Sequence, residues 1–270
     1  MSARLRRNTS TTSCMEKSSY RVIDAHAHLD ELSDAVSDIL RAQERGVAAI
    51  AGVGMNRESN ERILRLAEEF PGFVIPCIGL HPWRVNKETV DDDLSFIAAN
   101  VCRCAAVGEI GLDYKAKPKK ALQKKVFREL LGLAKRFEKP VITHSRYSYQ
   151  STFEMVVEAG VEKAVFHWYS GPLELLDEIF AKNFYISATP ALAYSKPHQA
   201  AVRKAPLANL VLETDCPERY GDLESRPEHV LRTLELAARV KELEPEEIAV
   251  ATTRNAERLL CIHSKYFFVP

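Results

Sequence analysis

The sequence has 270 residues, of which 46% are hydrophobic and 27% are charged, and its formal net charge is +0. This composition is typical of a soluble globular protein, and the zero net charge excludes a global field that recruits nucleic acid or an anionic membrane. No apolar run approaches the roughly 20 residues of a membrane-spanning helix. Six cysteines, without a CxxC pair or a secretory signal, indicate reduced thiols in a cytoplasmic compartment.

The first 19 residues are basic and rich in serine and threonine, and we expect them to form a disordered N-terminal arm. From Arg21 onward, short apolar segments alternate with longer amphipathic segments. The short segments, each followed by a predicted helix, are predicted strands at 21–27, 47–54, 73–82, 103–114, 139–145, 163–171, 183–190 and 208–217. A ninth helix begins at Pro245, a favourable first helical position, and residues 262–270 form a C-terminal tail.

The predicted strands are rich in valine, isoleucine and alanine and are mostly apolar on both faces, which is typical of buried parallel strands. Gly46, Gly72 and Gly160 follow predicted helices at positions where a glycine commonly ends a helix. Eight strand–helix units within residues 20–261 predict an α/β fold, a single TIM (β/α)₈ barrel with an extra C-terminal helix. A doubly wound sheet is the alternative, but no glycine-rich phosphate loop supports it.

Polar residues gather where the predicted strands end. In "RVIDAHAHLD", Asp24, His26 and His28 occupy alternate positions, so their side chains share one face of the first strand. Two histidines separated by one residue are a weak signal on their own. The signal gains weight only if other strands bring similar side chains to the same place.

Four other predicted strands do end in such side chains, namely Glu109 in "VGEIGLDY", His144 in "VITHSR", His167 in "AVFHW" and Asp215 in "LVLETDCP". The carboxyl ends of the strands form one rim in a TIM barrel, so we expect these residues to converge. Imidazoles and carboxylates without thiolates suit Zn²⁺, Mn²⁺, Mg²⁺, Fe²⁺ or Co²⁺. Six donors are too many for one open four-coordinate site and suit two divalent metal ions that share a carboxylate and a water.

These motifs resemble a known family. "DAHAHLD", "GLHP", "VGEIGLDY", "ITHSR", "HWYSG" and "LVLETDCP" occur in the order found in the TatD-like metal-dependent hydrolases of the amidohydrolase superfamily. The resemblance extends from Arg21 to about Leu260. It implies a TIM barrel, a divalent metal site and hydrolytic activity, commonly that of a DNase or a 3′ to 5′ exonuclease.

The resemblance implies six metal ligands, each at a position that matches a family motif. One ion is bound by His26, His28 and Asp215, the other by His144 and His167, and Glu109 bridges the two. Asp215 and Glu109 are also the expected catalytic residues, with Asp215 accepting the proton of the attacking water. Many relatives use a carboxylated lysine as the bridge, so a glutamate here looks like the TatD branch.

The sequence departs from the family pattern at positions that line the expected mouth. Trp83 follows "GLHP" where a histidine is frequent, and Lys115 follows "GLDY" where an aromatic residue is frequent. After the histidine of the sixth strand, Trp168 and Tyr169 replace a cysteine or small residue and a phenylalanine. These changes affect the expected substrate more than the expected hydrolysis.

Further polar residues have two readings each. We expect Asp24 to orient the first ligand histidine rather than to cap a backbone group, and Glu213 either to orient a ligand or to form a core ion pair. His81 and Arg146 are predicted to bind substrate, although the first could be a turn residue and the second an exposed loop residue. Asp113 is expected to hold the shape of its loop. Residues 115–128, with six lysines and one arginine, either contact a polyanion or form a solvated helix face, which is the commoner case.

The favoured function is a divalent-metal-dependent phosphodiesterase or deoxyribonuclease that acts on DNA or a nucleotide through a metal-activated water. The alternative is a carbonyl hydrolase of an ester, lactone, amide or aminoacyl-tRNA at the same site. A barrel that binds partners without catalysis is a third reading, which the complete set of expected ligands disfavours. No membrane association and no obligate protein partner are predicted.

Overall fold

A computed structural model of the chain describes residues 20–262. The expected N-terminal arm, residues 1–19, and all but the first residue of the expected C-terminal tail lie outside the described residues. Within the described part, no helix is long and apolar enough to cross a membrane. The cysteines there are all free thiols, in line with the expectation from their spacing.

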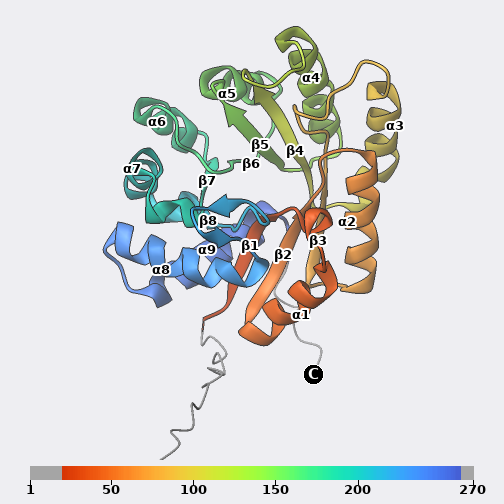
Figure 1. The fold of residues 1–270 in the computed structure, drawn as a ribbon. Helices are drawn as coiled ribbons and strands as arrows, with labels where there is room; N and C mark the ends of the chain where they lie inside the picture. The colour runs from red at the N-terminus through yellow and green to blue at the C-terminus, as the bar shows by residue number, and fades with distance from the viewer. Residues whose placement is uncertain (1–19, 263–270) are drawn as a thin grey trace, which may run out of the picture.

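Eight parallel strands form the centre of the molecule and are paired in chain order (Figure 1). They are β1 (Val22–Ala27), β2 (Val47–Val53), β3 (Val74–Ile78), β4 (Ala106–Asp113), β5 (Val141–Arg146), β6 (Ala164–Phe166), β7 (Tyr185–Ala188) and β8 (Leu210–Leu212). Each overlaps one predicted strand. A short hairpin of β9 (Arg219–Tyr220) and β10 (Leu223–Glu224) follows β8.

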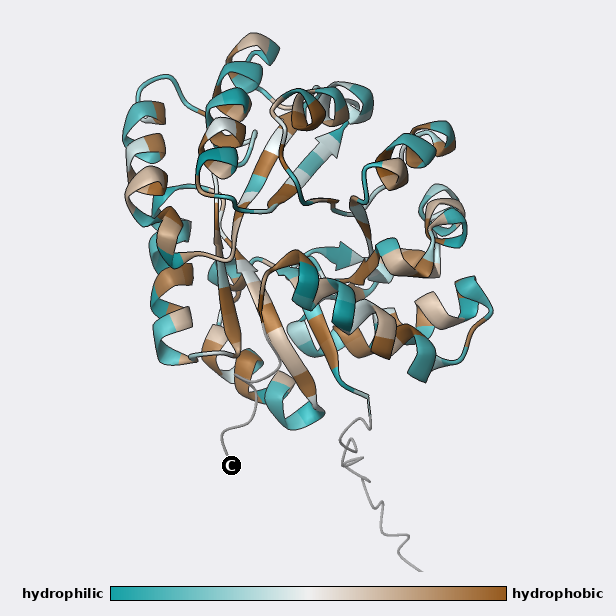
Figure 2. Ribbon diagram, turned by 180° about the vertical axis from the view of Figure 1, so that it is seen from behind, coloured by the Kyte–Doolittle hydropathy of each residue, from teal (hydrophilic) through white to brown (hydrophobic). Residues whose placement is uncertain are grey.

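Helices surround the strands (Figure 1). They are α1 (Ala35–Arg45), α2 (Arg57–Glu69), α3 (Val90–Asn100), α4 (Lys120–Arg136), α5 (Tyr149–Glu158), α6 (Leu173–Ala181), α7 (Lys196–Lys204), α8 (Val230–Lys241) and α9 (Pro245–Leu259). Figure 2 shows that the strands are mostly hydrophobic and that hydrophilic residues gather on the helices outside them. The predicted TIM barrel with an extra C-terminal helix is therefore confirmed.

Helix α1 illustrates how local chemistry sets the boundaries. The side chain of Asp34 accepts a hydrogen bond from the backbone N–H of Ser37 and so caps the N-terminus. At the other end Gly46 has φ 92°, a left-handed conformation, and its N–H donates to carbonyls of the last turn. Gly46 was one of the glycines predicted to end a helix.

The barrel interior contains mainly small and β-branched residues. Ile23, Ala49, Ile75 and other inward residues of β1 to β8 are buried in one cluster, and the end of α9 contributes Leu259 and Leu260 to it. Because the partly buried members of this cluster include the first residues of strands, α9 covers the end of the barrel where the strands begin. The polar residues are thus left to the opposite end.

The seam between the last and first strands is closed by residues that follow β8. The N–H of Asp215 donates to the carbonyl of His26 at 2.9 Å, and the N–H of His28 donates to the carbonyl of Cys216 at 2.8 Å. The pairing ladders of residues 20–262 run from β1 to β8 and do not join β8 back to β1. These two hydrogen bonds therefore bring His26, His28 and Asp215 side by side.

Candidate metal centre

Four of the predicted ligand side chains form a compact buried group. His26 Nε2, His28 Nε2, Glu109 Oε2 and Asp215 Oδ1 give five measured separations between 3.1 and 3.5 Å. A tetrahedral ion with bonds of about 2.0–2.1 Å requires ligand atoms about 3.3–3.4 Å apart. The spacing of these four atoms therefore fits one divalent cation at their centre.

The other carboxylate oxygen of Glu109 faces a second group of histidines. Glu109 Oε1 lies 2.9 Å from Nδ1 of His144, 2.9 Å from Nε2 of His167 and 3.3 Å from Nε2 of His81. One carboxylate thus presents each of its oxygens to a different set of nitrogen donors. This is the arrangement that a carboxylate bridging two cations requires.

The proton positions on two of these histidines follow from their outer partners. Nδ1 of His28 lies 3.0 Å from the carbonyl oxygen of Val53, which can only accept, so this nitrogen carries the hydrogen. Nε2 of His144 lies 3.3 Å from Oδ2 of Asp113 and is assigned the hydrogen for the same reason. When each ring is neutral, its other nitrogen, which faces Glu109, is unprotonated, and this is the form that binds a metal ion.

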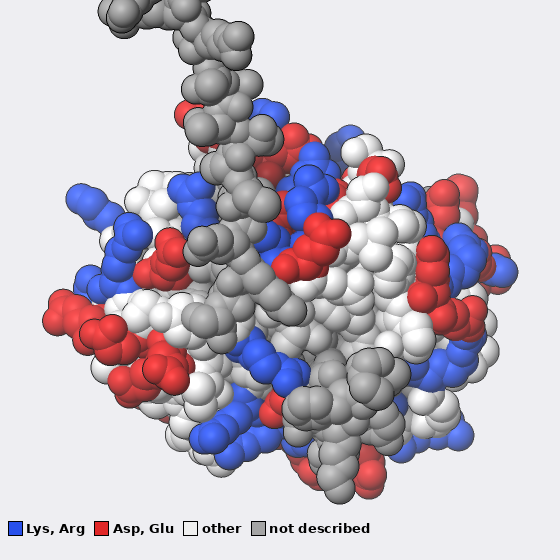
Figure 3. Space-filling view, turned by 90° about the horizontal axis from the view of Figure 1, so that it is seen from below, with Lys and Arg blue, Asp and Glu red and all other residues white. Residues whose placement is uncertain are grey.

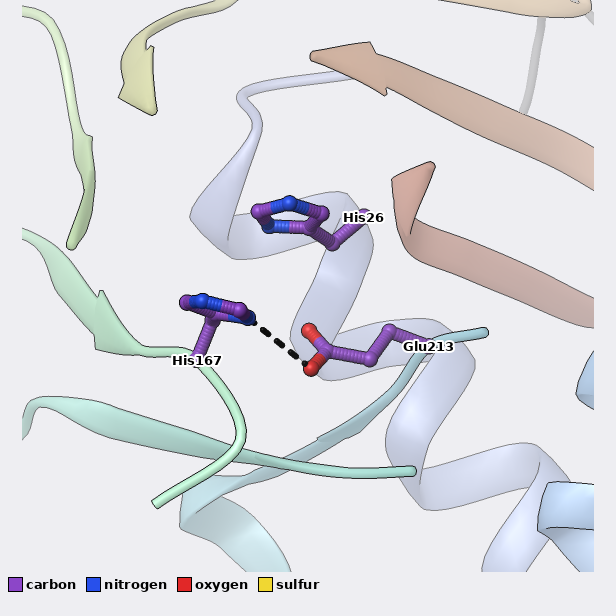
Figure 4. A group of neighbouring side chains, drawn as sticks. All are labelled: His26, His167 and Glu213. Carbon is purple, nitrogen blue, oxygen red and sulfur yellow. Dashed lines mark hydrogen bonds and ion pairs between the residues drawn. The ribbon is translucent and has the colours of Figure 1, made fainter. Parts of the chain in front are cut away.

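His167 is held in the same way by Glu213 (Figure 4). Its Nδ1 lies 3.3 Å from Oε1 of Glu213, and the ring stacks on His26 with the centroids 4.3 Å apart. The same Glu213 oxygen accepts the backbone N–H of Trp168 at 3.1 Å. Trp168 has φ 41°, a left-handed conformation that disfavours side chains, and this hydrogen bond helps to hold it there.

His81 differs from the other histidines in which ring nitrogen carries the hydrogen. Its Nδ1 accepts the backbone N–H of Trp83 at 3.1 Å, so the hydrogen of the neutral ring is on Nε2, which faces Glu109. Burial lowers the pKa of His81 to about 4, which keeps the ring neutral. His81 therefore offers an N–H donor to the centre and is not suited to be a metal ligand.

The electrostatics of the centre favour added positive charge. Burial alone would raise the pKa of Glu109, but the charge of His167 and the hydrogen bonds from His167 and His144 hold it well below its usual range. Burial opposes the charged form of His28 as well, yet the hydrogen bond and charge of Glu109 raise its pKa to about 9. Burial raises the pKa of Asp215. The negative charge of these buried carboxylates can be balanced either by protons on the histidines or by bound metal cations.

The expectation for Asp24 is wrong. Its carboxylate does not reach the ring of His26; it accepts the backbone N–H of His26 at 3.3 Å, and the N–H and hydroxyl of Thr214 at 2.9 and 2.5 Å. Asp24 thus caps backbone groups and ties the end of β8 to β1. Nδ1 of His26 is buried without a hydrogen-bond partner among the described residues.

Asp113 does hold its loop, as expected, and it does more. Its Oδ1 accepts the backbone N–H groups of Lys115 at 2.7 Å and Ala116 at 3.1 Å. Its Oδ2 lies against Nε2 of His144, as described above, and 3.9 Å from a guanidinium nitrogen of Arg146. Hydrogen bonds from His144 and the indole of Trp83 outweigh burial and hold the pKa of Asp113 below its usual range.

A cavity of about 440 Å³ opens above the centre. Its walls include both predicted substrate-binding residues, two tryptophans and two acidic residues: Arg146, His81, Trp83, Trp168, Glu31 and Glu218. Arg146 is the only lysine or arginine among its lining residues. The basic run at 115–128 does not line the cavity; Lys115 and Lys120 lie over the rings of Tyr147 and Tyr114.

At the rim of this TIM barrel, each carboxylate oxygen of one glutamate faces its own set of histidines. This combination is typical of metal-dependent hydrolases. The side-chain clusters of the rim could hold metal ions. The chain belongs to the TatD related DNase family, whose sequence pattern matches residues 23–261. The family and the hydrolase class that were predicted from the sequence motifs are confirmed.

Individual relatives agree with this assignment. The chain is 30% identical to deoxyribonuclease TATDN3 of Homo sapiens over 257 residues, which cover 88% of this chain and 94% of the relative. It is 33% identical to the uncharacterized metal-dependent hydrolase YabD of Bacillus subtilis over 256 residues, or 90% of this chain and all of the relative. The crystal structure of the TatD homologue YjjV from Escherichia coli superimposes with a TM-score of 0.81 at 28% identity, over 88% of this chain and 97% of that one.

Sequence reasoning missed the outer partners of the site. The carbonyl of Val53 and the indole of Trp83 contact ring nitrogens or their carboxylate partner, but neither residue type signals such a role. Glu213 was left open between two roles because its neighbour across the barrel depends on the strand order.

Proposed function

We propose that this protein hydrolyses phosphodiester bonds in DNA or a nucleotide with two divalent metal ions. The proposal is based on one observation: the two carboxylate oxygens of Glu109 face two different sets of histidine nitrogens. The first ion is assigned to His26, His28 and Asp215, the second to His144 and His167, with Glu109 between them. Zn²⁺, Mn²⁺ and Mg²⁺ all suit this set of donors.

When bound, the two cations would acidify a water and offset the negative charge of a phosphate. The carboxylate of Asp215 lines the cavity and is the proposed acceptor of the proton of that water. The Nε2–H of His81 points to the same centre and is proposed to donate to a substrate oxygen. The guanidinium of Arg146, half exposed at the cavity wall, is proposed to hold a second phosphate oxygen.

The name of the human relative supports DNA as the substrate. Carbonyl hydrolysis is the second candidate, and the character of the cavity favours it. Among the described residues, Arg146 is the only lysine or arginine on walls that also include Trp83, Trp168, Glu31 and Glu218. A wall of this kind also suits an uncharged aromatic ester, whereas a long polyanion gains little from it.

The test compares single-stranded and double-stranded oligonucleotides, bis-p-nitrophenyl phosphate, p-nitrophenyl acetate and a lactone in parallel. We expect phosphodiester cleavage that EDTA abolishes and that Mn²⁺, Zn²⁺ or Mg²⁺ restores. Glu109→Gln should lower kcat/KM by about 10³-fold or more, because it removes the negative charge shared by both ions. Glu129→Gln, at an exposed glutamate of α4, is the matched control. Cleavage in the presence of EDTA would reject the mechanism, and activity on the esters alone would select the second candidate.

We also propose that residues 20–261 form one catalytic domain that works in the cytoplasm without an obligate protein partner. The single barrel and its single rim of donors support this proposal. A chain that starts at Tyr20 should therefore retain the metal-dependent activity of the full chain. Loss of activity with intact folding would assign a catalytic role to residues 1–19.

A further inference from the structure

Trp83 lies between the cavity and two histidines of the centre. It follows Pro82 in the loop after β3, and 51% of its surface is exposed. Its ring packs edge-on against His81, with centroids 4.7 Å apart, and against His144, with centroids 5.6 Å apart. A half-exposed tryptophan that contacts both rings stands between solvent and the second donor group.

Both N–H groups of Trp83 are used. The backbone N–H donates to Nδ1 of His81 at 3.1 Å, as described above. The indole Nε1–H donates to Oδ2 of Asp113 at 2.5 Å. Oδ2 is the oxygen that lies 3.3 Å from Nε2 of His144. The indole of Trp83, the carboxylate of Asp113 and the imidazole of His144 therefore form a continuous series of contacts, and His144 is a candidate metal ligand.

The indole of Trp83 is the main hydrogen-bond donor to Oδ2 of Asp113 apart from His144. Asp113 is 0% exposed, and its other oxygen is taken by two backbone N–H groups of the loop. Arg146 is more distant, at 3.9 Å, and its side chain is 55% exposed. The orientation of Oδ2 toward His144 thus depends on a direct hydrogen bond from Trp83.

We propose that Trp83 is a positioning residue for the second metal ion, because its indole N–H holds the Asp113 carboxylate against His144. The proposal rests on the proposed function in one respect, namely that His144 is a ligand. Carboxylates behind a ligating histidine fix its proton and its orientation, and removing such a partner commonly weakens metal binding 10- to 100-fold. In the family that the sequence resembles, a histidine is frequent at this position, and here the residue is Trp83.

The test is Trp83→Phe, which removes the indole N–H but keeps an aromatic ring and the backbone N–H that serves His81. Metal-free protein is titrated with Co²⁺ alone in a calorimeter. We expect the dissociation constant of the second Co²⁺ to rise about 10-fold or more, while that of the first Co²⁺ stays within about two-fold. Tyr194→Phe is the matched control, because Tyr194 is likewise half exposed, does not line the cavity and has no described contact with Asp113 or His144; it should leave both constants unchanged.

A double-mutant cycle with Asp113→Asn tests the route of the effect. Asp113→Asn alone should also raise the dissociation constant of the second Co²⁺. In that background Trp83→Phe should raise it little further, since the two side chains act in series. Saturating Co²⁺ should return kcat of Trp83→Phe to within about three-fold of wild type, which a residue that contacts the reacting atoms would not show.

The outcomes separate this proposal from the proposed function. If the wild-type protein binds two Co²⁺ ions and Trp83→Phe binds both as tightly, the role of Trp83 is refuted and the two-metal site stands. Equal losses from Trp83→Phe in the wild-type and Asp113→Asn backgrounds would refute the path through Asp113. If the wild-type protein binds fewer than two ions, the proposed two-metal function itself fails.

Discussion

Four of the five histidines around Glu109 differ in which nitrogen of the neutral ring carries the hydrogen. When neutral, His28, His144 and His167 each give their N–H to an acceptor outside the centre and turn a lone pair inward. His81 accepts a backbone N–H from outside and turns its own N–H inward. Ligand and donor roles are thus set by the neighbours of each ring and not by the residue type.

Another histidine, His198, is buried away from the donor group, and we expect it to make the stability of the protein depend on pH. Its Nε2 accepts the N–H of Thr189 at 3.1 Å, and its Nδ1 lies 2.8 Å from the carbonyl of Tyr169. Burial lowers its pKa from 6.5 to about 4. As pH falls below 6.5, the unfolded chain binds a proton that the folded chain refuses, so the contribution of His198 is complete above pH 6.5 and is lost toward pH 4.

We expect this effect to be about 2 kcal/mol between pH 7.5 and pH 5. Urea unfolding of wild type and His198→Gln at both pH values measures it in the presence of EDTA. The variant should be less stable at pH 7.5, and the difference from wild type should shrink by that amount at pH 5. A difference that does not change with pH would contradict the prediction.

Among the elements, the C-terminal helix has the clearest structural role. Leu259, at the end of α9, is 0% exposed and packs inside the barrel where the strands begin. Leu259→Ala should lower the free energy of unfolding by about 2–5 kcal/mol through lost burial and a cavity. Val250→Ala on the same helix, where the side chain is 44% exposed, should cost no more than about 0.5 kcal/mol.

Urea denaturation of both variants provides the measurement. Similar small losses for the two positions would show that α9 is an appendage and not part of the barrel core. The centre lies at the other end of the barrel, so Leu259→Ala is expected to leave Co²⁺ binding unchanged under conditions where the variant is folded.

The same elements show what local sequence can and cannot predict. All eight strands were predicted, because each short apolar run has a helix pattern after it. Several of their ends were placed too late: β6 ends at Phe166 and not beyond Trp168, since the backbone turns left-handed there. The partner of Asp24 was missed because Thr214 reaches it only across the seam between β8 and β1. Contacts of this kind depend on the register of strands that are distant in the sequence, and the hydrophobic periodicity of the sequence does not predict that register.

For the whole molecule, charge is balanced and spread. Figure 3 shows that lysine and arginine alternate with aspartate and glutamate over the visible part of the face seen from below. The formal net charge is +0, and Arg146 is the only lysine or arginine within residues 20–262 that lines the cavity. Cleavage of single-stranded DNA should therefore depend weakly on salt.

We expect a plot of log kcat/KM against log KCl concentration, at fixed Mn²⁺, to have a slope between about −1 and −3, because each phosphate contact with a single strand contributes about −0.7. Lengthening the oligonucleotide beyond a few residues should change kcat/KM little. A slope steeper than about −5 would show that residues 115–128 contact the strand, and Lys117→Gln with Lys119→Gln would then reduce it.

The closure of the barrel by its first and last strands has a consequence during synthesis. His26 and His28 leave the ribosome early, whereas Asp215, which completes their donor group, follows β8 near the end of the chain (Figure 1). A nascent or prematurely terminated polypeptide therefore lacks the first donor group, however well its earlier strands have folded. That group can form only once the residues that follow β8 have left the ribosome.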